Sequence, residues 1–250
     1  SRLITIAGAF TQSSTLTTDT STTLYFSGSG AITGTLSGFA TPPNLTFLAS
    51  RTLGSNASTT ALTVSAGTLD VSSRLITIAG AFTQSSTLTT NASSRLYFSG
   101  SGAIAGTLTG TSALGNVEFL ASRSFSGNAS TTDFVITTGT VTASTLLTIS
   151  GTFTQGGTFT STGNTLYLTG SGKTHTGTMT GASNALNHVF IAGGGTTVLP
   201  NASTTNFTIN SGSALSAPSL LTIAGNYSNS GSYENNSGTL YFSGSGVTLS

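Results

Sequence analysis

The stretch SRLITIAGAFTQSSTLTT at residues 73–90 repeats residues 1–18 letter for letter. Two looser copies follow, STLLTISGTFTQGGTFTS from Ser144 and PSLLTIAGNYSNSGSYEN from Pro218. These copies divide the chain into repeat units 1–72, 73–143 and 144–217 and a partial unit 218–250. Units of this length that follow one another without linkers indicate stacking, because each unit needs its neighbour to cover an apolar face. We therefore expect residues 1–250 to form one continuous repeat rod.

Each unit contains four short apolar cores separated by small residues. In the first unit they are residues 3–6, 24–26, 45–47 and 62–64, a spacing of about 18 residues. Apolar and polar residues that alternate between Gly, Ser and Asn breaks are typical of short, half-buried strands. The sequence therefore predicts an all-β fold, a β-solenoid of about 72-residue repeats. Each repeat would supply about four coils, with equivalent cores above one another and about fourteen coils in all.

The alternative architecture is a row of small β-sandwich domains, one for each repeat. The missing linkers and the fourfold sub-repeat disfavour it, as does the absence of Trp and Cys, which mark the cores of immunoglobulin-like domains.

Charged residues are scarce: six Lys and Arg against five Asp and Glu, for a net charge of +1. Such a chain cannot build the basic stripe of a nucleic-acid-binding protein.

Without Cys the chain has no disulfide, thiolate metal site or cysteine nucleophile. No apolar run approaches the roughly 18 residues of a membrane span. Because it has no initiator Met or signal peptide, we expect a segment of a longer mature polypeptide.

Three phrases carry a resemblance to known proteins: LTIAGNYSNSGSYENNSGTLYFSGSG at 221–246, TLYLTGSG at 165–172 and NASTTNFTINSG at 201–212. They resemble the degenerate repeats of secreted bacterial surface proteins, namely filamentous-haemagglutinin-like adhesins, autotransporter passengers and fibre proteins of that kind. The resemblance implies a right-handed β-helix displayed outside the cell for adhesion or matrix building. It brings no shared catalytic residues. The near-exact 72-residue period departs from the looser repeats of those families.

The sequence GSGKT at 170–174 looks like the end of a phosphate-binding loop. That loop requires a Gly where Tyr167 stands and a helix after the Lys, and the sister units have GSGA at the same corner. We predict no cofactor there.

Histidines and acids are scattered. His175 and His188 occur in the third unit without an acidic neighbour in sequence, so we expect solvated surface residues and not metal ligands or bases. The five acids are Asp19, Asp70, Glu118, Asp133 and Glu234. Asp19 aligns with Asn91, which predicts an Asx turn. A polysaccharide-cleaving or calcium site is disfavoured, and we predict no catalytic residue, no metal site and no enzyme.

Two sets of asparagines recur. Asn44, Asn116 and Asn187 each stand three residues before a Phe that we expect in the core, namely Phe47, Phe119 and Phe190, and Asn56, Asn128 and Asn201 each open the sequence NASTT. We interpret them as corner residues that satisfy backbone groups at a bend. The alternative is N-glycosylation of Asn56, Asn128 and Asn201, because Asn-Ala-Ser is an acceptor sequon. O-glycosylation of Ser and Thr stays open as well.

These observations favour a structural protein: a segment of an extracellular fibre or cell-surface appendage that assembles end to end or side by side. The alternative is an adhesin that binds glycans or surfaces. Less favoured are an ice-binding protein, suggested by Thr-x-Thr pairs at 15–17, 87–89 and 158–160, and a carbohydrate-active enzyme.

Overall fold

The structure is a computed structural model that describes residues 2–37, 39, 41–111, 114–143, 145–161, 163–179, 186–245 and 249. The chain forms two compact units, Ser1–Gly127 and Asn128–Ser250. Within the described residues all regular structure is β, and no helix is long and apolar enough to cross a membrane. The predicted start of the third repeat at Ser144 lies outside the described residues.

The strands of the first unit are β1 (Arg2–Ile6), β2 (Phe10–Gln12), β3 (Thr22–Phe26), β4 (Gly30–Gly34), β5 (Asn44–Phe47), β6 (Arg51–Leu53), β7 (Ala57–Thr59), β8 (Leu62–Val64), β9 (Thr68–Asp70), β10 (Leu75–Ile78), β11 (Phe82–Gln84), β12 (Thr87–Thr89), β13 (Arg95–Phe98), β14 (Gly102–Gly106), β15 (Leu114–Phe119) and β16 (Arg123–Phe125).

The strands of the second unit are β17 (Ala129–Ile136), β18 (Thr140–Ala143), β19 (Leu146–Ile149), β20 (Phe153–Gln155), β21 (Thr158–Ser161), β22 (Thr165–Leu168), β23 (Thr176–Gly177), β24 (Leu186–Ile191), β25 (Gly195–Val198), β26 (Ala202–Ile209), β27 (Ser213–Ser216), β28 (Leu220–Ile223), β29 (Tyr227–Asn229), β30 (Ser232–Glu234) and β31 (Thr239–Phe242).

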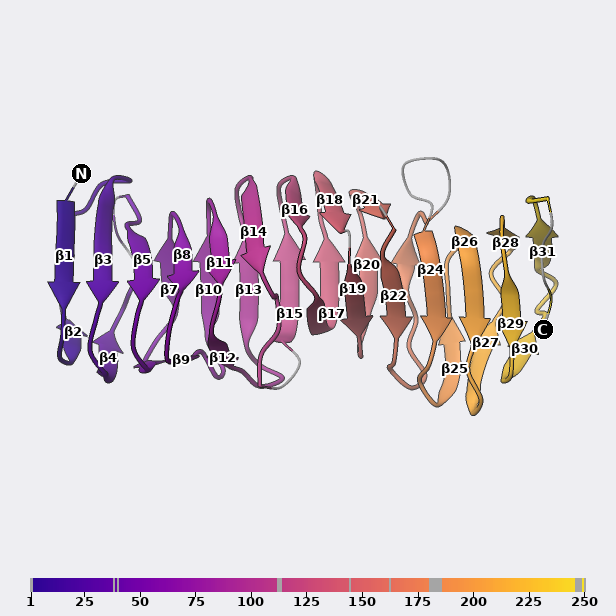
Figure 1. Cartoon of the computed structure of the whole chain (residues 1–250), viewed down its shortest axis with the longest axis horizontal. Helices are drawn as coiled ribbons and strands as arrows, with labels where there is room; N and C mark the ends of the chain where they lie inside the picture. The colour runs from indigo at the N-terminus through magenta and orange to yellow at the C-terminus, as the bar shows by residue number, and fades with distance from the viewer. Residues whose placement is uncertain are drawn as a thin grey trace. The chain divides into compact units, whose positions relative to one another are not determined.

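The first unit winds as a three-faced β-solenoid in which each strand pairs in parallel with a strand one coil away (Figure 1). Face A contains β1-β3-β5-β8-β11-β14-β16, face B contains β2-β4-β6-β9-β12, and face C contains β7-β10-β13-β15. The predicted β-solenoid is thus confirmed. Across both units the described strands make about 12 turns, fewer than expected, because a pairing step such as Ile4 to Leu24 takes 20 residues.

The 72-residue repeat does not make a whole number of coils. From Ile4, three pairing steps through Leu24 and Leu45 reach Leu62, which is three complete coils. Two further faces carry the chain to Ile76 on β10, the repeat of Ile4. One repeat therefore makes three and two-thirds coils.

Identical sequence consequently lies on different faces of the first unit. Ile4 is on face A, whereas its copy Ile76 is on face C, paired with Ala57 and Leu96. The expectation that equivalent cores lie above one another holds for the four cores within the first repeat but is wrong between repeats.

The second unit shows the same shift between the third repeat and the partial fourth. Leu147 pairs with Ala129 of the preceding coil and lies in a column of paired residues that continues through Leu166, Val189, Phe207 and Tyr227. Its copy, Leu221, instead pairs with Ala202 and Leu240. The strand β26 serves both columns, because Ala202–Thr204 pairs with β28 and Phe207–Ile209 pairs with β29.

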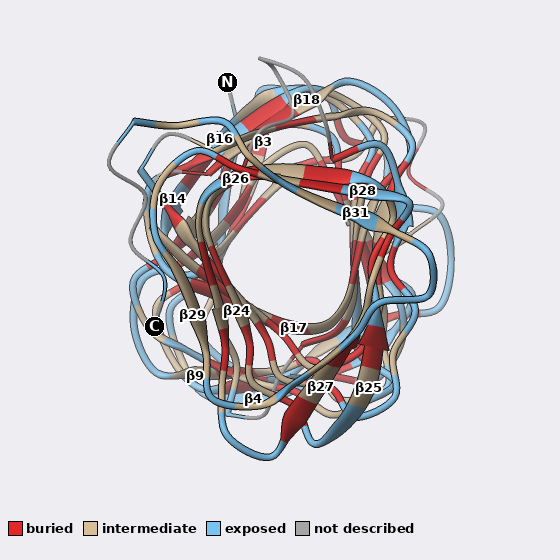
Figure 2. Ribbon diagram, turned by 90° about the vertical axis from the view of Figure 1, so that its right-hand side faces the viewer, coloured by how far each residue is buried: buried red, intermediate tan, exposed pale blue. Residues whose placement is uncertain are grey.

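The interior consists of every second residue of the strands, as their burial shows (Figure 2). Aromatic rings stack from coil to coil: the ring centroids of Phe26 and Phe47 are 4.9 Å apart, and those of Phe98 and Phe119 are 5.1 Å apart. Stacking of equal side chains on paired strands stabilises each coil against the next.

The third repeat departs from the predicted core at Phe190. Val189 pairs with Leu166, so Phe190 faces outward against Tyr167, with ring centroids 4.4 Å apart, and Ile191 occupies the buried position. The prediction that Phe190 is a core residue equivalent to Phe47 and Phe119 is therefore wrong. Local insertions in the third repeat move the aromatic residue by one position, which turns its side chain to the other surface.

Candidate functional site

Two arginines of the first unit are buried inside the solenoid. Arg51 on β6 is 2% exposed, and its Nη1 and Nη2 donate to the carbonyl oxygens of Gly8 at 2.5 Å and Ile6 at 3.0 Å. Its guanidinium carbon lies 5.2 Å from the centroid of the Phe26 ring. Its partner on β4 is Gly30, and a Cβ added at Gly30 would lie 3.5 Å from Arg51 Nη1.

Arg123 on β16 repeats this arrangement in the second repeat. Its Nη1 donates to the carbonyl oxygen of Gly80, its Nη2 donates to that of Ile78 at 3.2 Å, and it stacks 4.9 Å from the Phe98 ring. Burial lowers the pKa of Arg123 to about 10. The Nε atoms of both arginines have no partner in the described part of the chain. With its two Nη atoms bonded to backbone carbonyls, each buried guanidinium joins coils.

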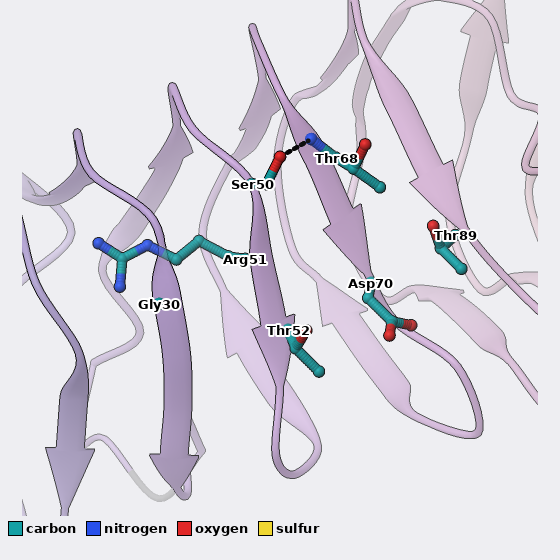
Figure 3. A pocket seen from close by; sticks show the side chains of 7 residues that line it. All are labelled: Gly30, Ser50, Arg51, Thr52, Thr68, Asp70 and Thr89. Atoms are coloured by element: carbon teal, nitrogen blue, oxygen red, sulfur yellow. Dashed lines mark hydrogen bonds between the residues drawn. The ribbon is translucent and has the colours of Figure 1, made fainter.

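A surface groove of about 370 Å³ lies over the strands β4, β6, β9 and β12 (Figure 3). It is lined by Gly30, Ser50, Arg51, Thr52, Thr68, Asp70 and Thr89. Figure 3 shows the Arg51 side chain running toward Gly30 and away from Thr68 and Asp70.

Two polar side chains of this groove have structural partners. Ser50 Oγ accepts a hydrogen bond from the Thr68 amide at 3.1 Å, and Asp70 Oδ1 accepts one from the Ser72 amide at 2.9 Å. The groove offers hydroxyls and one carboxylate, which suit hydrogen bonding to a polyol. It lacks the second carboxylate that glycoside hydrolysis requires.

The predicted Asx turn is confirmed at Asp19 and Asn91. Asp19 Oδ1 accepts from the Ser21 amide at 2.9 Å, and Asn91 Oδ1 accepts from the Ser93 amide at 2.9 Å. Hydrogen bonds from the Ser21 and Thr22 hydroxyls lower the pKa of Asp19. Asp133 likewise accepts from the Thr152 amide at 2.8 Å. Among the described residues no three His, Asp or Glu side chains gather into a metal-binding group.

The three NASTT asparagines perform the same structural task. The side-chain oxygens of Asn56, Asn128 and Asn201 accept from backbone amides of the next coil, those of Leu75 at 2.9 Å, Leu146 at 3.4 Å and Leu220 at 2.9 Å. The second set behaves similarly, since Asn44 and Asn187 donate to the carbonyl oxygens of Thr20 and Asn164. The corner interpretation is confirmed for Asn56, Asn128 and Asn201. Asn44 and Asn187 also satisfy backbone groups but lie within the strands β5 and β24, and for Asn116 the interpretation stays a prediction. Glycosylation of the three NASTT asparagines stays a prediction.

His175 contradicts the expectation of a solvated histidine. It is 3% exposed, and its Nδ1 accepts a hydrogen bond from the Phe153 amide at 3.0 Å. Burial lowers its pKa to about 4. His188 is half-buried, stacks on Phe190 with centroids 4.1 Å apart, and has a pKa lowered by burial. The neighbouring GSGKT sequence forms a turn followed by short bridges and no helix, which agrees with the rejection of a phosphate loop.

Sequence reasoning missed the buried polar side chains. Arg51 and Arg123 each follow the dipeptide Ala-Ser, and Gln12, Gln84 and Gln155 each end the tripeptide FTQ. All five are buried. Gln84 Nε2 donates to the carbonyl oxygen of Thr109 at 2.6 Å, which ties one coil to the next. Their recurrence was the available signal, but polar residues are normally assigned to the surface.

Comparison with protein-family models, curated proteins and solved structures found no match for this chain.

Proposed function

We propose that this chain is a non-catalytic structural segment of an extracellular fibre or surface appendage, whose function lies in length and stiffness. The observation that supports this most is the phase of the repeat. Because each repeat advances by three and two-thirds coils, successive copies of one sequence lie on different faces. A surface built this way has no side reserved for one ligand, which suits a scaffold.

The polar chemistry of the described residues also supports a scaffold. The carboxylates of Asp19 and Asp70 accept hydrogen bonds from groups of their own turns, and that of Asp133 accepts from Thr152 of the next coil. The guanidiniums of Arg51 and Arg123 bind backbone carbonyls. Such groups raise the cohesion between coils and leave few free for acid–base catalysis.

An adhesin that binds glycans is the second candidate, and the hydroxyl-lined groove around Thr52, Thr68 and Thr89 favours it. The Thr-x-Thr pairs support an ice-binding surface less well. Thr87 and Thr89 lie on β12 opposite Thr68 and Asp70, whereas Thr15 and Thr17 lie outside the strands. A regular threonine array on one face is therefore interrupted.

Two measurements test the structural proposal. Immunolabelling of intact cells that produce the parent protein should place this segment outside the cell. Electron microscopy of the purified chain and of a variant without residues 73–143 should show assemblies whose subunit length shortens with the deletion. Labelling only after the cells are opened, or particles that never assemble and do not change length, would contradict the proposal. Saturable binding to a glycan array that is lost in Asp70→Ala would favour the adhesin instead.

A further inference from the structure

The first two repeats and the third place different residues at one interior position. Ile32 pairs with Phe10, and Ile104 pairs with Phe82, so both isoleucines line the core. In the third repeat Thr154 pairs with Thr176, which sets His175 opposite Phe153. A titratable ring thus occupies the position of a buried isoleucine, where it is 3% exposed.

The hydrogen bonds of His175 fix its protonation state. The Phe153 amide donates to Nδ1 at 3.0 Å, so this nitrogen carries no proton and the neutral ring keeps its proton on Nε2. The backbone amide of His175 donates to the carbonyl oxygen of Val198 at 2.8 Å, which joins the same residue to the next coil. His175 therefore links three coils: its ring accepts a hydrogen bond from the coil of Phe153, and its backbone amide donates one to the coil of Val198.

The coil at His175 is also less firmly paired than its counterparts. The strands β4 and β14, which follow the same corner in the first two repeats, pair with the preceding coil through three residues each, whereas β23 pairs with β20 through two. Fewer ladder hydrogen bonds hold this segment to β20. A local disturbance can consequently open it without unfolding the rest of the unit.

We propose that His175 is an acid-sensitive lock, at which protonation of Nδ1 by solvent opens the coil between β20 and β25 in the third repeat. The added proton places an N–H group against the Phe153 N–H, so the hydrogen bond is lost and a cation is left in an apolar interior. The open segment lets the imidazolium reach water and uncovers the side of Phe153.

Among the described residues, burial and not a neighbouring charge shifts the pKa of His175. The segment that contains His175 and β23 pairs with β20 and with Val198 of β25, and the sequences FTQ, TG and GTTV of these strands carry no titratable side chain. Lys173 lies two residues before it, Asp133 on β17 is engaged by Thr152, and His188 lies on β24 next to Phe190. Burial is the one cause that lowers the pKa of His175 to about 4.

The sign of the pH dependence follows from this pKa. A histidine whose folded-state pKa is below its ordinary value of 6.5 favours the closed coil fully above pH 6.5 and loses that contribution as the pH falls toward about 4. The opening equilibrium constant should rise by about tenfold per pH unit in this window, on the order of a hundredfold in all.

The test is hydrogen exchange of the full chain between pH 7 and pH 4, followed by mass spectrometry and corrected for the intrinsic exchange rate. We expect the corrected exchange rate to rise as the pH falls in peptides that cover Phe153 and His175. In peptides that cover Phe82 and Ile104 we expect it to stay constant. His175→Ile, which restores the residue of the sister repeats, should abolish the rise. Ile104→His should transfer it to the second repeat.

A flat response of the third repeat in the native chain, or a rise that persists in His175→Ile, would overturn the proposal. NMR titration of the native imidazole keeps the test decisive if a variant fails to fold. An unprotonated Nδ1 with titration displaced well below pH 6.5 supports the lock, and titration near pH 6.5 contradicts it.

Discussion

The second and third repeats use one backbone path with different interior chemistry. In the second repeat Arg123 lies opposite Gly102, and Ile104 fills the neighbouring core position. In the third repeat Thr197 takes the place of the arginine, since it pairs with Leu215 as Arg51 pairs with Leu69. His175 takes the place of the isoleucine.

The comparison shows which contacts the coil requires. The second repeat is held by a buried guanidinium and a five-residue strand, β14, whereas the third has a two-residue strand, β23, and a Thr197 hydroxyl without a partner among the described residues. The corner pair of Gln84 with Gly106 and of Gln155 with Gly177 is the same in both. The coil path thus tolerates changes in the core but keeps the glycine above the glutamine.

The largest effect is expected from removal of the buried guanidinium. Arg123→Ala should lower the free energy of unfolding by about 3 kcal/mol, because the Gly80 carbonyl loses its charged donor and the Phe98 ring loses its packing partner. Chemical denaturation followed by circular dichroism measures this loss. Arg123→Met, which keeps the apolar stem, should lose less. Equal stability of all three proteins would show that the guanidinium does not join the coils.

A smaller loss is expected at the shared corner. Gly106 has a φ of 79°, and a Cβ there would lie 1.9 Å from the Gln84 carbonyl oxygen. Gly106→Ala should therefore cost about 2 kcal/mol through strain and displaced backbone. Gly8→Ala is the matched control, because a Cβ at Gly8 would have no atom within 4 Å and the φ of Gly8 is not positive. A shift of the thermal midpoint that is the same in both variants would contradict this account.

The smallest effect has the opposite sign. Thr197 is fully buried, and its hydroxyl has no hydrogen-bond partner within the described residues. Thr197→Val keeps the shape and removes the unpaired oxygen, so it should raise the free energy of unfolding by about 1 kcal/mol. Thr204→Val is a suitable control, because the Thr204 hydroxyl donates to the Asn206 carbonyl at 2.8 Å and its loss should destabilise. A stability decrease in both variants would show that Thr197 has a partner of its own.

The fold class could be predicted from the sequence, because apolar alternation and Gly-rich breaks recur along the whole chain. The phase of the repeat could not be predicted from the average spacing. The cores at 24–26, 45–47 and 62–64 stack one coil apart, but the next core at 75–78 follows too soon for a full coil and falls on another face. The number of residues in each corner sets the number of residues in a coil, and hydrophobic periodicity does not predict it.

The candidate sites were predictable where a side chain serves its own turn, as at Asp19 and Asn91. They were not predictable where a polar residue enters the interior. Arg51 is buried beside Gly30, a neighbour that only the register identifies. His175 was hidden by a local insertion, which displaced it from alignment with Ile32 and Ile104.

Cross-linking of introduced cysteine pairs tests whether the second repeat starts on a different face from the first, because the chain has no native cysteine. Thr63 pairs with Thr83, whereas stacking of every successive core would place Thr63 next to Thr77. All three side chains are half-exposed. We expect the pair Thr63→Cys and Thr83→Cys to form an intramolecular cross-link with a short bifunctional reagent and the pair Thr63→Cys and Thr77→Cys to form none. Efficient cross-linking of the second pair without the first would contradict this expectation.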